Sequence, residues 1–307
     1  TEMSFHVPVL LKESIDYLIT KKDGIYFDGT AGFGGHSEKI LEKINSSGKL
    51  IATDKDSKAF EYCKEKFSRD KRFSIYRTSF TDIDSISKIE FIDGFDGILA
   101  DLGVSSFQLD SVESGFTFRE DAALDLRMNI EKGITASDLL NKFSQEEITK
   151  ILFEYGEERN ARMITQKIIS FRTIEKFSRT SQLRKIIEQI SPQRFHTKTL
   201  SRVFQALRIF VNNELDELKI FLDKSVTLLK PGGRLVVLSY HSLEDRIVKE
   251  KIRYESLDCI CPPGTPICIC KKEQRLKKIT KALTPNELEI NINRRARSAK
   301  MRVAERV

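Results

Sequence analysis

The sequence lacks long apolar runs, and this absence narrows the class of protein. No stretch of the 307 residues approaches the roughly 18 consecutive apolar residues of a membrane-spanning helix. Residues 1–14 show neither the basic segment nor the apolar core of a secretory leader, and internal repeats and low-complexity segments are also missing. With 40% hydrophobic residues, the composition is that of an ordinary globular protein. We therefore expect a soluble, cytoplasmic protein with no membrane partner.

Cysteine is also scarce, with five residues in the chain. Four of them form two Cys-x-Cys pairs around a Pro-Pro-Gly turn: Cys259, Cys261, Cys268 and Cys270. In an intracellular chain this cluster argues against disulfides and admits a metal held by thiolates. The spacing differs from the Cys-x-x-Cys pairs usual at zinc sites, so a reduced hairpin without metal is the alternative. We predict no metal site and keep the four cysteines as candidate ligands, while Cys63 lies in a helical pattern and is predicted to be a core residue.

Positive charge is concentrated at one end of the chain. The net charge is +7, yet residues 271–307 alone contain 12 Lys/Arg against 4 Asp/Glu. The preceding residues are close to neutral, with 40 basic against 41 acidic side chains. Basic clusters attract phosphate backbones, and arginine also stacks on and hydrogen-bonds to nucleic-acid groups. The pattern favours a nucleic-acid partner, with a solvated tail as the alternative.

The glycine-rich stretch FDGTAGFGGHSEKI, residues 27–40, lacks two features of nucleotide-binding loops. A phosphate-binding P-loop requires Gly-Lys-Ser/Thr, but Gly34 is followed by Gly35 and His36. A dinucleotide fingerprint requires a third glycine where Ser37 stands. An acidic residue at a strand end, followed by a glycine turn without phosphate-binding groups, suits a nucleoside that carries an amino acid. The alternative is a plain strand-to-helix turn in which glycine supplies a positive φ.

Short apolar runs alternate with helical patterns from residue 24 to residue 103, as in a parallel sheet covered by helices on both faces. The predicted strands are residues 25–27, 50–53, 73–76 and 97–100. Asp28, Asp54 and Asp101 follow the first, second and fourth strands, and Phe80 follows the third. Because ligands of open α/β sheets bind at the carboxyl ends of the strands, these side chains are the first candidates for a binding site.

The middle of the chain has a different pattern, with helical spacing and no predicted strand. The helical stretches are residues 136–155, 160–171, 181–190 and 200–213, with a capping box at Ser144. The α/β pattern then returns with a helix at 215–229, a turn at 230–234, a strand at 235–239 and a later helix capped by Thr284. We therefore predict an α/β domain formed by residues 1–106 and 213–307, interrupted by an all-helical domain at residues 107–212.

The spacing of Asp54 indicates a cofactor that contains adenosine. Asp54 lies 22 positions after Gly32, close to the offset of about 20 residues at which a carboxylate accepts hydrogen bonds from a ribose. NAD and S-adenosylmethionine both carry an adenosine ribose, so Asp54 alone does not choose between them. The glycine pattern and the Pro231-Gly232-Gly233 turn favour S-adenosylmethionine, because that turn recurs before a strand in class I (Rossmann-like) methyltransferases. An NAD-dependent oxidoreductase stays the alternative.

Uncommon strings, such as DLGVSSFQLD and HSLEDR, occur along almost the whole chain: residues 6–11, 28–37, 101–110, 155–159, 204–208, 241–246 and 295–300. In these strings the chain resembles the ribosomal RNA small-subunit methyltransferase H family, also called MraW. The resemblance implies a class I methyltransferase fold, S-adenosylmethionine as cofactor, and methylation of the N4 amine of a cytidine in the decoding region of bacterial 16S ribosomal RNA. The partner would be this RNA or the 30S subunit, and a homodimer is left open. A non-catalytic RNA-binding assembly factor is a further alternative.

The resemblance also assigns candidate cofactor-binding residues: Gly34, Gly35, His36, Asp54, Phe80, Asp101 and Gln108. Asp54, Phe80 and Asp101 agree with the interpretation of the strand ends. Phe80 would lie against the adenine, with an ordinary core phenylalanine as the alternative. His36 would meet the amino-acid end of the cofactor from the first turn of a helix, although without the resemblance it would be taken for a surface histidine.

Methyl transfer to the exocyclic nitrogen of cytosine needs an acceptor for the amino hydrogens, because the nitrogen lone pair is delocalised into the ring, and it needs the nitrogen in line with the methyl group. Asp101 is the candidate catalytic acceptor; its alternative role is to hold the amino group of the cofactor. Many amino-methyltransferases place Asp/Asn-Pro-Pro-aromatic here, whereas this chain has Asp-Leu-Gly-Val at residues 101–104. The aromatic residue that stacks on the base must come from another segment, and we predict Tyr240, with Phe107 and Phe116 as alternatives.

Basic side chains in two segments are candidates for RNA contacts. The inserted helices contribute His196, Lys198, Arg202 and Arg208, whose alternative role is helix packing with solvated charges. The basic C-terminal segment contributes Arg295, Arg297 and Lys300. Arg294 replaces the proline of the family pattern and adds a charge to this segment.

Overall fold

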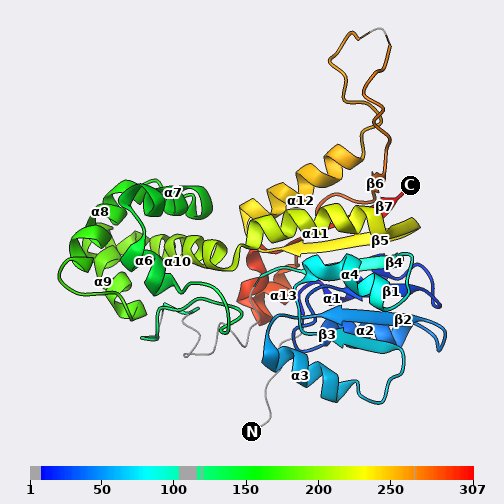
Figure 1. The fold of residues 1–307 in the computed structure, drawn as a ribbon, viewed down its shortest axis with the longest axis horizontal. Coiled ribbons are helices and arrows are strands. Elements are labelled where there is room, and N and C mark those ends of the chain that lie inside the picture. The colour runs from blue at the N-terminus through cyan, green and yellow to red at the C-terminus, as the bar shows by residue number, and fades with distance from the viewer. Residues whose placement is uncertain (1–7, 104–115, 119, 266) are drawn as a thin grey trace. The chain divides into compact units, whose positions relative to one another are not determined.

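The structure, a computed structural model, describes residues 8–103, 116–118, 120–265 and 267–307. The chain divides into two compact units (Figure 1). We call residues Thr1–Gly103 and Leu215–Val307 the sheet unit, and residues Val104–Glu214 the helical unit. None of the described helices is both long enough and apolar enough to cross a membrane.

Among the described residues, the sheet unit contains one seven-stranded sheet in the order β3-β2-β1-β4-β5-β7-β6. Its strands are β1 (Ile25–Asp28), β2 (Lys49–Thr53), β3 (Phe73–Tyr76), β4 (Phe95–Asp101), β5 (Leu229–Ser239), β6 (Leu276–Lys278) and β7 (Lys300–Arg306). Strands β1 to β5 pair in parallel, and β7 pairs antiparallel with β5 and β6. All five predicted strands lie in this sheet, and the predicted α/β fold is confirmed.

Helices cover both faces of the sheet. On one face, Tyr26 and Leu50 pack in a core with helices α1 (Leu11–Leu18), α2 (Gly35–Lys43) and α3 (Ser57–Lys66). On the other face, Phe27 and Ile51 pack with α4 (Ile83–Ile89), α11 (Glu214–Leu228) and α12 (Ser242–Glu255). Successive strand residues point to opposite faces, so a strand that is buried on both sides consists of continuous apolar residues. This is why the apolar runs of β1, β2 and β4 are central strands, whereas β3 lies at the edge of the sheet and is only partly buried.

The turn predicted at residues 230–234 lies inside β5 rather than before it. Leu229 pairs with Phe95 and Arg234 pairs with Gly97, so residues 230–233 bulge out of the ladder. Gly232 has a φ of 77°, a conformation that glycine adopts without strain. The helix that precedes β5 ends at Leu228.

The helical unit is built from α6 (Ala136–Lys142), α7 (Gln145–Gly156), α8 (Ala161–Arg172), α9 (Thr180–Ile190) and α10 (His196–Asn212). The stretch 136–155 therefore forms two helices, which separate where Ser144 caps α7. The capping box is confirmed, since Ser144 Oγ accepts a hydrogen bond from the Glu147 amide and Glu147 Oε2 accepts one from the Ser144 amide. The apolar faces of these helices meet in one core that includes Leu139, Ile164 and Leu207.

The N-cap of the late helix α13 (Glu287–Ile292) lies two residues after the predicted cap. Asn286, and not Thr284, is its N-cap, because the Asn286 side chain accepts a hydrogen bond from the Glu289 amide at 2.9 Å. Helix α13 follows β6 and precedes β7 in the chain. Its Glu289 carboxylate then accepts a hydrogen bond from the Leu10 amide at 2.6 Å, which ties the segment before α1 to the C-terminal region.

Candidate active site

The candidate site lies where the strand order reverses. From β1 the chain continues to β2 and β3 on one side, and β4 and β5 lie on the other side of β1. In sheets of this kind, ligands bind in the crevice at the carboxyl ends of the strands beside this switch point. Asp28 ends β1 and Asp101 ends β4, so the two predicted strand-end aspartates flank the switch point. Thr30 links them, because its amide donates to Asp28 Oδ1 and its Oγ1 accepts from the Asp101 amide at 2.7 Å.

The glycine-rich loop crosses the carboxyl ends of three strands. The Gly29 amide donates to Leu99 O in β4, and the Ala31 amide donates to Thr53 O at the end of β2. Gly34 has a φ of 78° and is the N-cap of α2. A Cβ atom at Gly34 would lie 2.7 Å from the Phe67 ring, and a Cβ atom at Gly35 would lie 2.4 Å from Pro8. Packing within the protein alone therefore requires glycine at both positions, and their predicted contact with a cofactor stays a prediction.

Asp54 accepts a hydrogen bond from the glycine-rich loop and can still accept further hydrogen bonds. Its Oδ2 accepts a hydrogen bond from the Gly32 amide at 2.7 Å, and its Oδ1 accepts one from the Asp56 amide at 2.8 Å. Burial raises the pKa of Asp54 to about 6, against the lowering effect of these two amides. A carboxylate has about four acceptor positions. About two of them are therefore left for donors such as ribose hydroxyls.

Asp28 is a buried carboxylate that was predicted at a strand end but was not among the predicted cofactor-binding residues. Its Oδ2 accepts a hydrogen bond from Ser37 Oγ at 2.7 Å, so it connects the end of β1 to the first turn of α2. Burial raises the pKa of Asp28 to about 6. The side chain is fully buried, and its contacts orient the loop between β1 and α2. The position of an aspartate directly after an apolar strand was the signal that could have identified it.

Asp101, Tyr240 and His36 form a polar cluster at the end of β4. Tyr240 Oη donates to Asp101 Oδ1 at 2.7 Å, and His36 Nδ1 lies 3.8 Å from Asp101 Oδ2. Burial raises the pKa of Asp101 to about 7, although 21% of its side chain remains exposed and can be reached by a ligand. Burial also lowers the pKa of His36 to about 4, which keeps its imidazole neutral near pH 7. His36 Nε2 is buried and makes no hydrogen bond within the described residues.

Tyr240 is held in place from two sides. Its amide donates to Glu244 Oε2 at 2.8 Å, and its ring lies 3.4 Å from the position that a Cβ atom would take at Gly103. Burial, followed by the charge of Asp101, raises the pKa of Tyr240 well above its usual value, so the hydroxyl stays protonated and donates. Glu244, itself buried, is a residue that the sequence analysis missed, and its place three residues after the strand-following His241 gave no local signal.

The other two described aromatic candidates, Phe80 and Phe116, belong to different units of the chain. Phe80 begins the short helix η1 (Phe80–Asp82), and its ring centroid lies 4.5 Å from that of Phe221. Its Cβ atom lies 3.0 Å from the position of a Cβ atom at Gly29, so it borders the glycine-rich loop. Phe116 is buried in the core of the helical unit, and this overturns its choice as an alternative base-stacking residue. Gln108 and Phe107 lie outside the described residues.

The predicted RNA contacts of the helical unit are partly engaged within the protein. Arg208 forms a bidentate ion pair with Glu214, at 2.8 and 2.9 Å. Arg202 Nη1 lies 3.5 Å from the buried Glu158 and keeps 35% of its side chain exposed. His196 begins α10, and its Nε2 lies 2.7 Å from Ser191 O. Lys198 is exposed. The four residues lie on one helix, but the structure does not gather them around a single cavity.

The C-terminal candidates lie on and beside β7. Arg297, in the short helix η4 (Arg294–Ser298), is exposed, and Lys300 begins β7 with 48% of its side chain exposed. Lys300 Nζ lies 3.3 Å from Asp245 Oδ2. The side chain of Arg295 lies outside the described residues.

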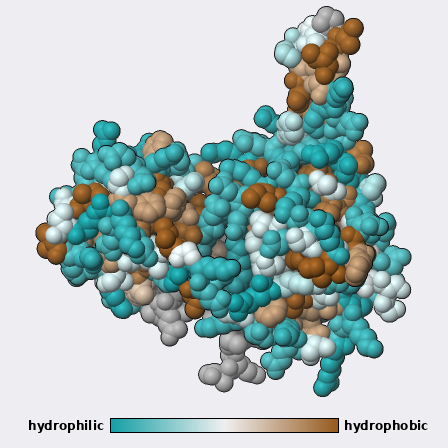
Figure 2. Space-filling view, in the orientation of Figure 1, coloured by the Kyte–Doolittle hydropathy of each residue, from teal (hydrophilic) through white to brown (hydrophobic). Residues whose placement is uncertain are grey.

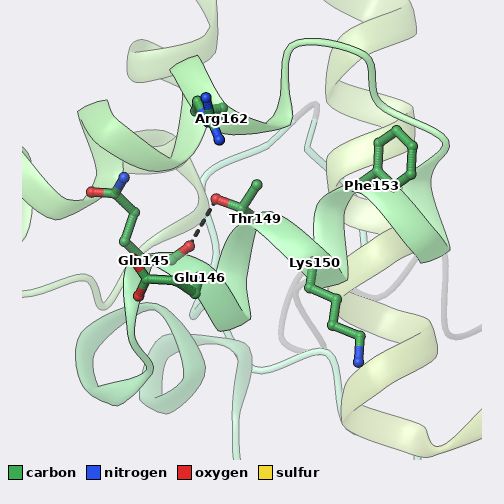
Figure 3. Close-up of a pocket in the computed structure, with 6 residues that line it drawn as sticks. All are labelled: Gln145, Glu146, Thr149, Lys150, Phe153 and Arg162. Atoms are coloured by element: carbon green, nitrogen blue, oxygen red, sulfur yellow. Dashed lines mark hydrogen bonds between the residues drawn. The ribbon is translucent and has the colours of Figure 1, made fainter.

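A separate surface pocket lies entirely within the helical unit (Figure 3). Its volume is about 280 Å³. Gln145, Glu146, Thr149 and Phe153 line it from α7, and Arg162 lines it from α8. Ligand pockets usually enclose roughly 300–1,000 Å³ behind apolar walls. This pocket is slightly smaller and contains none of the predicted site residues.

The sequence matches the profile of the MraW methylase family over residues 3–307. The chain belongs to the MraW methylase family. Among its relatives, a protein of Caldicellulosiruptor saccharolyticus is 48% identical over 98% of this chain and 99% of its own length. Proteins of Halothermothrix orenii and Fusobacterium nucleatum are 47% and 43% identical, over 98% and 99% of this chain and 98% and 97% of their own. All three are named "Ribosomal RNA small subunit methyltransferase H". The cluster of Asp101, Tyr240 and His36 is therefore a candidate active site of a MraW methylase.

Proposed function

We propose that the protein transfers the methyl group of S-adenosylmethionine to the N4 amine of a cytidine in the decoding region of small-subunit ribosomal RNA. Membership of the MraW methylase family supports methyl transfer, and the names of the relatives support the RNA substrate. The observation that carries the proposal is the cluster of Asp101, Tyr240 and His36 beside the glycine-rich loop. The carboxyl group of Asp101, with a pKa of about 7, supports its role as the acceptor for the amine.

The residues present fit S-adenosylmethionine. Asp54 keeps acceptor capacity for the two ribose hydroxyls, and the buried His36 Nε2 is a polar atom without a partner among the described residues. His36 Nε2, in the tautomer that carries a proton there, would donate to the carboxylate of the methionine end. Phe80 supplies apolar surface for the adenine, and Gly34, Gly35 and Gln108 complete the predicted set. When bound, the cofactor supplies an electrophilic methyl group on a sulfonium.

Asp101 prepares the amine for attack. Tyr240 Oη occupies Asp101 Oδ1, which leaves Oδ2 to accept a hydrogen from the cytosine amine. This hydrogen bond favours a pyramidal nitrogen whose lone pair points at the methyl carbon. The bound cofactor would supply the methyl group and keep the electron pair of the broken C–S bond on sulfur, and Asp101 would take up the extra proton of the amine. A carboxylate with a pKa near 7 is well matched to this proton transfer at neutral pH.

Basic side chains position the RNA. Arg297 and Lys300 are exposed beside the sheet, and Arg295 belongs to the same segment. Arg202, Arg208 and His196 are the proposed contacts of the helical unit. Phosphate contacts of this kind hold a nucleic acid in register without reading its sequence.

The test is a methylation assay with a defined product. The protein is incubated with tritiated S-adenosylmethionine and small ribosomal subunits from a strain that lacks it, and the RNA is digested and its labelled nucleosides are identified. We expect labelled N4-methylcytidine with the unchanged protein and almost none with Asp101→Asn. Asp16→Asn, an exposed aspartate on α1, is the matched control and should behave as the unchanged protein.

Three results would contradict the proposal. Label in another nucleoside would keep the methyltransferase and overturn the target atom. No label with subunits at several stages of maturation, together with retained RNA binding, would favour the non-catalytic assembly factor. Quenching of NADH fluorescence without any response to S-adenosylhomocysteine would favour the oxidoreductase.

A further inference from the structure

The segment between α12 and β6, residues 256–275, is held by something other than apolar packing. Its described residues form neither a helix nor a strand. In Figure 1 the segment, drawn in orange, extends from the end of α12 as a long loop. Ile260, Ile267 and Ile269 are 47%, 76% and 78% exposed, and Figure 2 shows the brown, apolar surface gathered at the end of this loop. Side chains that are exposed to this extent do not form a core.

An ion-pair network closes the base of the segment. Glu255, the last residue of α12, is fully buried and accepts hydrogen bonds from Arg275 at 2.6 and 2.7 Å. Lys251 Nζ also lies 2.6 Å from the Glu255 carboxylate. The Arg275 amide donates to Glu255 O at 2.9 Å, so the chain leaves and returns at the same place. These contacts fix the two ends of the loop but do not reach its middle.

The middle of the segment is where four sulfur atoms converge. Cys268 Sγ lies 3.6 Å from Cys259 Sγ, 3.9 Å from Cys261 Sγ and 3.5 Å from Cys270 Sγ. Cys270 Sγ lies 3.8 Å from Cys259 Sγ, and all four sulfurs lie within 4.8 Å of one another. A zinc ion with four sulfur ligands at about 2.3 Å has tetrahedral edges of roughly 3.8 Å. The spacing of the sulfurs therefore matches the corners of such a site.

The same distances do not suit disulfides. A disulfide joins two sulfurs at about 2.05 Å and leaves other sulfurs apart, whereas here Cys268 has three sulfur neighbours at similar distances. Backbone amides also point at the sulfurs: the Ile260 amide donates to Cys270 Sγ and the Cys261 amide donates to Cys259 Sγ, both at 3.4 Å. Such donors stabilise thiolates, and hydrogen bonds to ligand atoms are a regular part of metal sites.

We propose that Cys259, Cys261, Cys268 and Cys270 bind one Zn²⁺ ion in a tetrahedral, structural site. Four thiolates are soft ligands that favour zinc or an iron–sulfur centre over magnesium or calcium, and four protein ligands leave no open position for catalysis. The ion holds the middle of residues 256–275, as the pair of Glu255 and Arg275 holds its base. A loop without its own core gains its order from the metal, because the binding free energy of a structural zinc ion becomes folding free energy.

The test measures metal content and coordination in the full chain. The protein is purified without added metal, and its metals are quantified by inductively coupled plasma mass spectrometry. We expect about one zinc per chain, and replacement of zinc by Co²⁺ should give the intense sulfur-to-metal charge-transfer absorption and the visible bands of a tetrahedral thiolate site. Cys268→Ser should lose zinc, whereas Cys63→Ser, at the buried cysteine of α3, should retain it.

Each other outcome would overturn the proposal. Protein that holds less than about a tenth of a zinc per chain, does not take up added zinc and shows four reactive thiols would favour a reduced hairpin. Loss of the thiols without metal would indicate disulfides. Stoichiometric iron with the absorption of a thiolate-bound iron centre would overturn the choice of zinc. These measurements do not depend on methylation, so they test the zinc site independently of the proposed function.

Discussion

Two groups of ionisable side chains in the sheet unit differ in what holds them. Asp28, Asp54 and Asp101 follow central strands, and backbone amides or hydroxyl groups bind each of them. The four cysteines of residues 256–275 lie on a loop with exposed isoleucines. A site on core strands is formed before its ligand arrives, whereas a site on a loop without a core needs its ligand for order. The comparison predicts that changes at the aspartates affect chemistry and changes at the cysteines affect local structure.

Asp101→Asn should have the largest effect. We expect the single-turnover rate of methyl transfer to fall on the order of 10²- to 10⁴-fold, because an amide cannot take the proton of the amine. The midpoint of thermal unfolding should not fall, because the substitution removes a buried acid whose ionised form is disfavoured. The rate is measured by rapid quench, and unfolding by calorimetry. Tyr240→Phe, which keeps the ring and removes the hydrogen bond to Asp101, should lose less activity. If Asp101→Asn failed to fold, the contrast between the aspartates and the cysteines would be wrong.

Removal of zinc should affect local structure rather than methyl transfer. After chelation, or in Cys268→Ser, we expect hydrogen exchange of amides in residues 256–275 to become roughly 10²-fold faster, because the loop loses the interaction that orders it. Exchange in β1 and β4 should stay unchanged, since those strands belong to the two cores of the sheet. Mass spectrometry of peptic fragments measures both regions in one sample. Equal protection of residues 256–275 with and without metal would show that the loop has another support.

Asp54→Asn should weaken cofactor binding without unfolding the site. Hydrogen bonds to a charged group contribute about 1.5–3 kcal/mol each, so we expect the Kd for S-adenosylhomocysteine to rise roughly 10- to 100-fold. Isothermal titration calorimetry measures the change. Asp56→Asn is the matched control, because Asp56 caps α3 and asparagine caps helices equally well. Similar weakening in both variants would place the effect in the loop rather than in a contact of Asp54 with the ribose.

The buried aspartates also give binding a pH dependence. The pKa of Asp54 is about 6 in the folded protein and near 4 in an unfolded chain, so the folded state holds more protons between these values. Asp54 therefore lowers the free energy of unfolding as the pH rises from about 4 to 6. Ribose hydroxyls donate to the ionised form, so the affinity for S-adenosylhomocysteine should rise roughly tenfold from pH 5 to pH 7. Calorimetry at the two pH values checks this, and Asp54→Asn should remove most of the dependence.

The smallest predicted effect concerns two arginines. One is held by contacts within the protein, like the strand-end aspartates, and the other is exposed. Arg208 is held in a bidentate ion pair with Glu214, and Arg297 is exposed. Arg297→Ala should weaken RNA binding a few-fold and lower the salt dependence of binding by about one charge, without a change in stability. Arg208→Ala should lower stability, because it leaves Glu214 without its partner. Filter binding across salt concentrations and thermal unfolding separate the two, with Lys12→Ala on α1 as the control for a lost surface charge.

Local pattern was enough to predict the strands and the side chains that follow them. Asp28, Asp54 and Asp101 were placed at strand ends because a strand buried on both faces is a continuous apolar run. The capping box at Ser144 could also be predicted from local sequence, because all its contacts lie within four residues. Local pattern failed where a neighbour distant in sequence decides the outcome. The turn at 230–234 became a bulge because β5 pairs with β4 on both sides of it.

The sequence by itself determined which residue types stand at the ends of the strands, and it carried the motifs of the MraW methylase family, because both depend on short stretches of chain. Only the tertiary structure decided which of these groups meet. Tyr240 and Asp101 are 139 positions apart, and their hydrogen bond exists because β5 lies beside β4 in the sheet. The four cysteine sulfurs come from two Cys-x-Cys pairs seven residues apart, and the folding of the segment brings them within 4.8 Å of one another. Such distances follow from the packing of the whole chain, and no local periodicity encodes them.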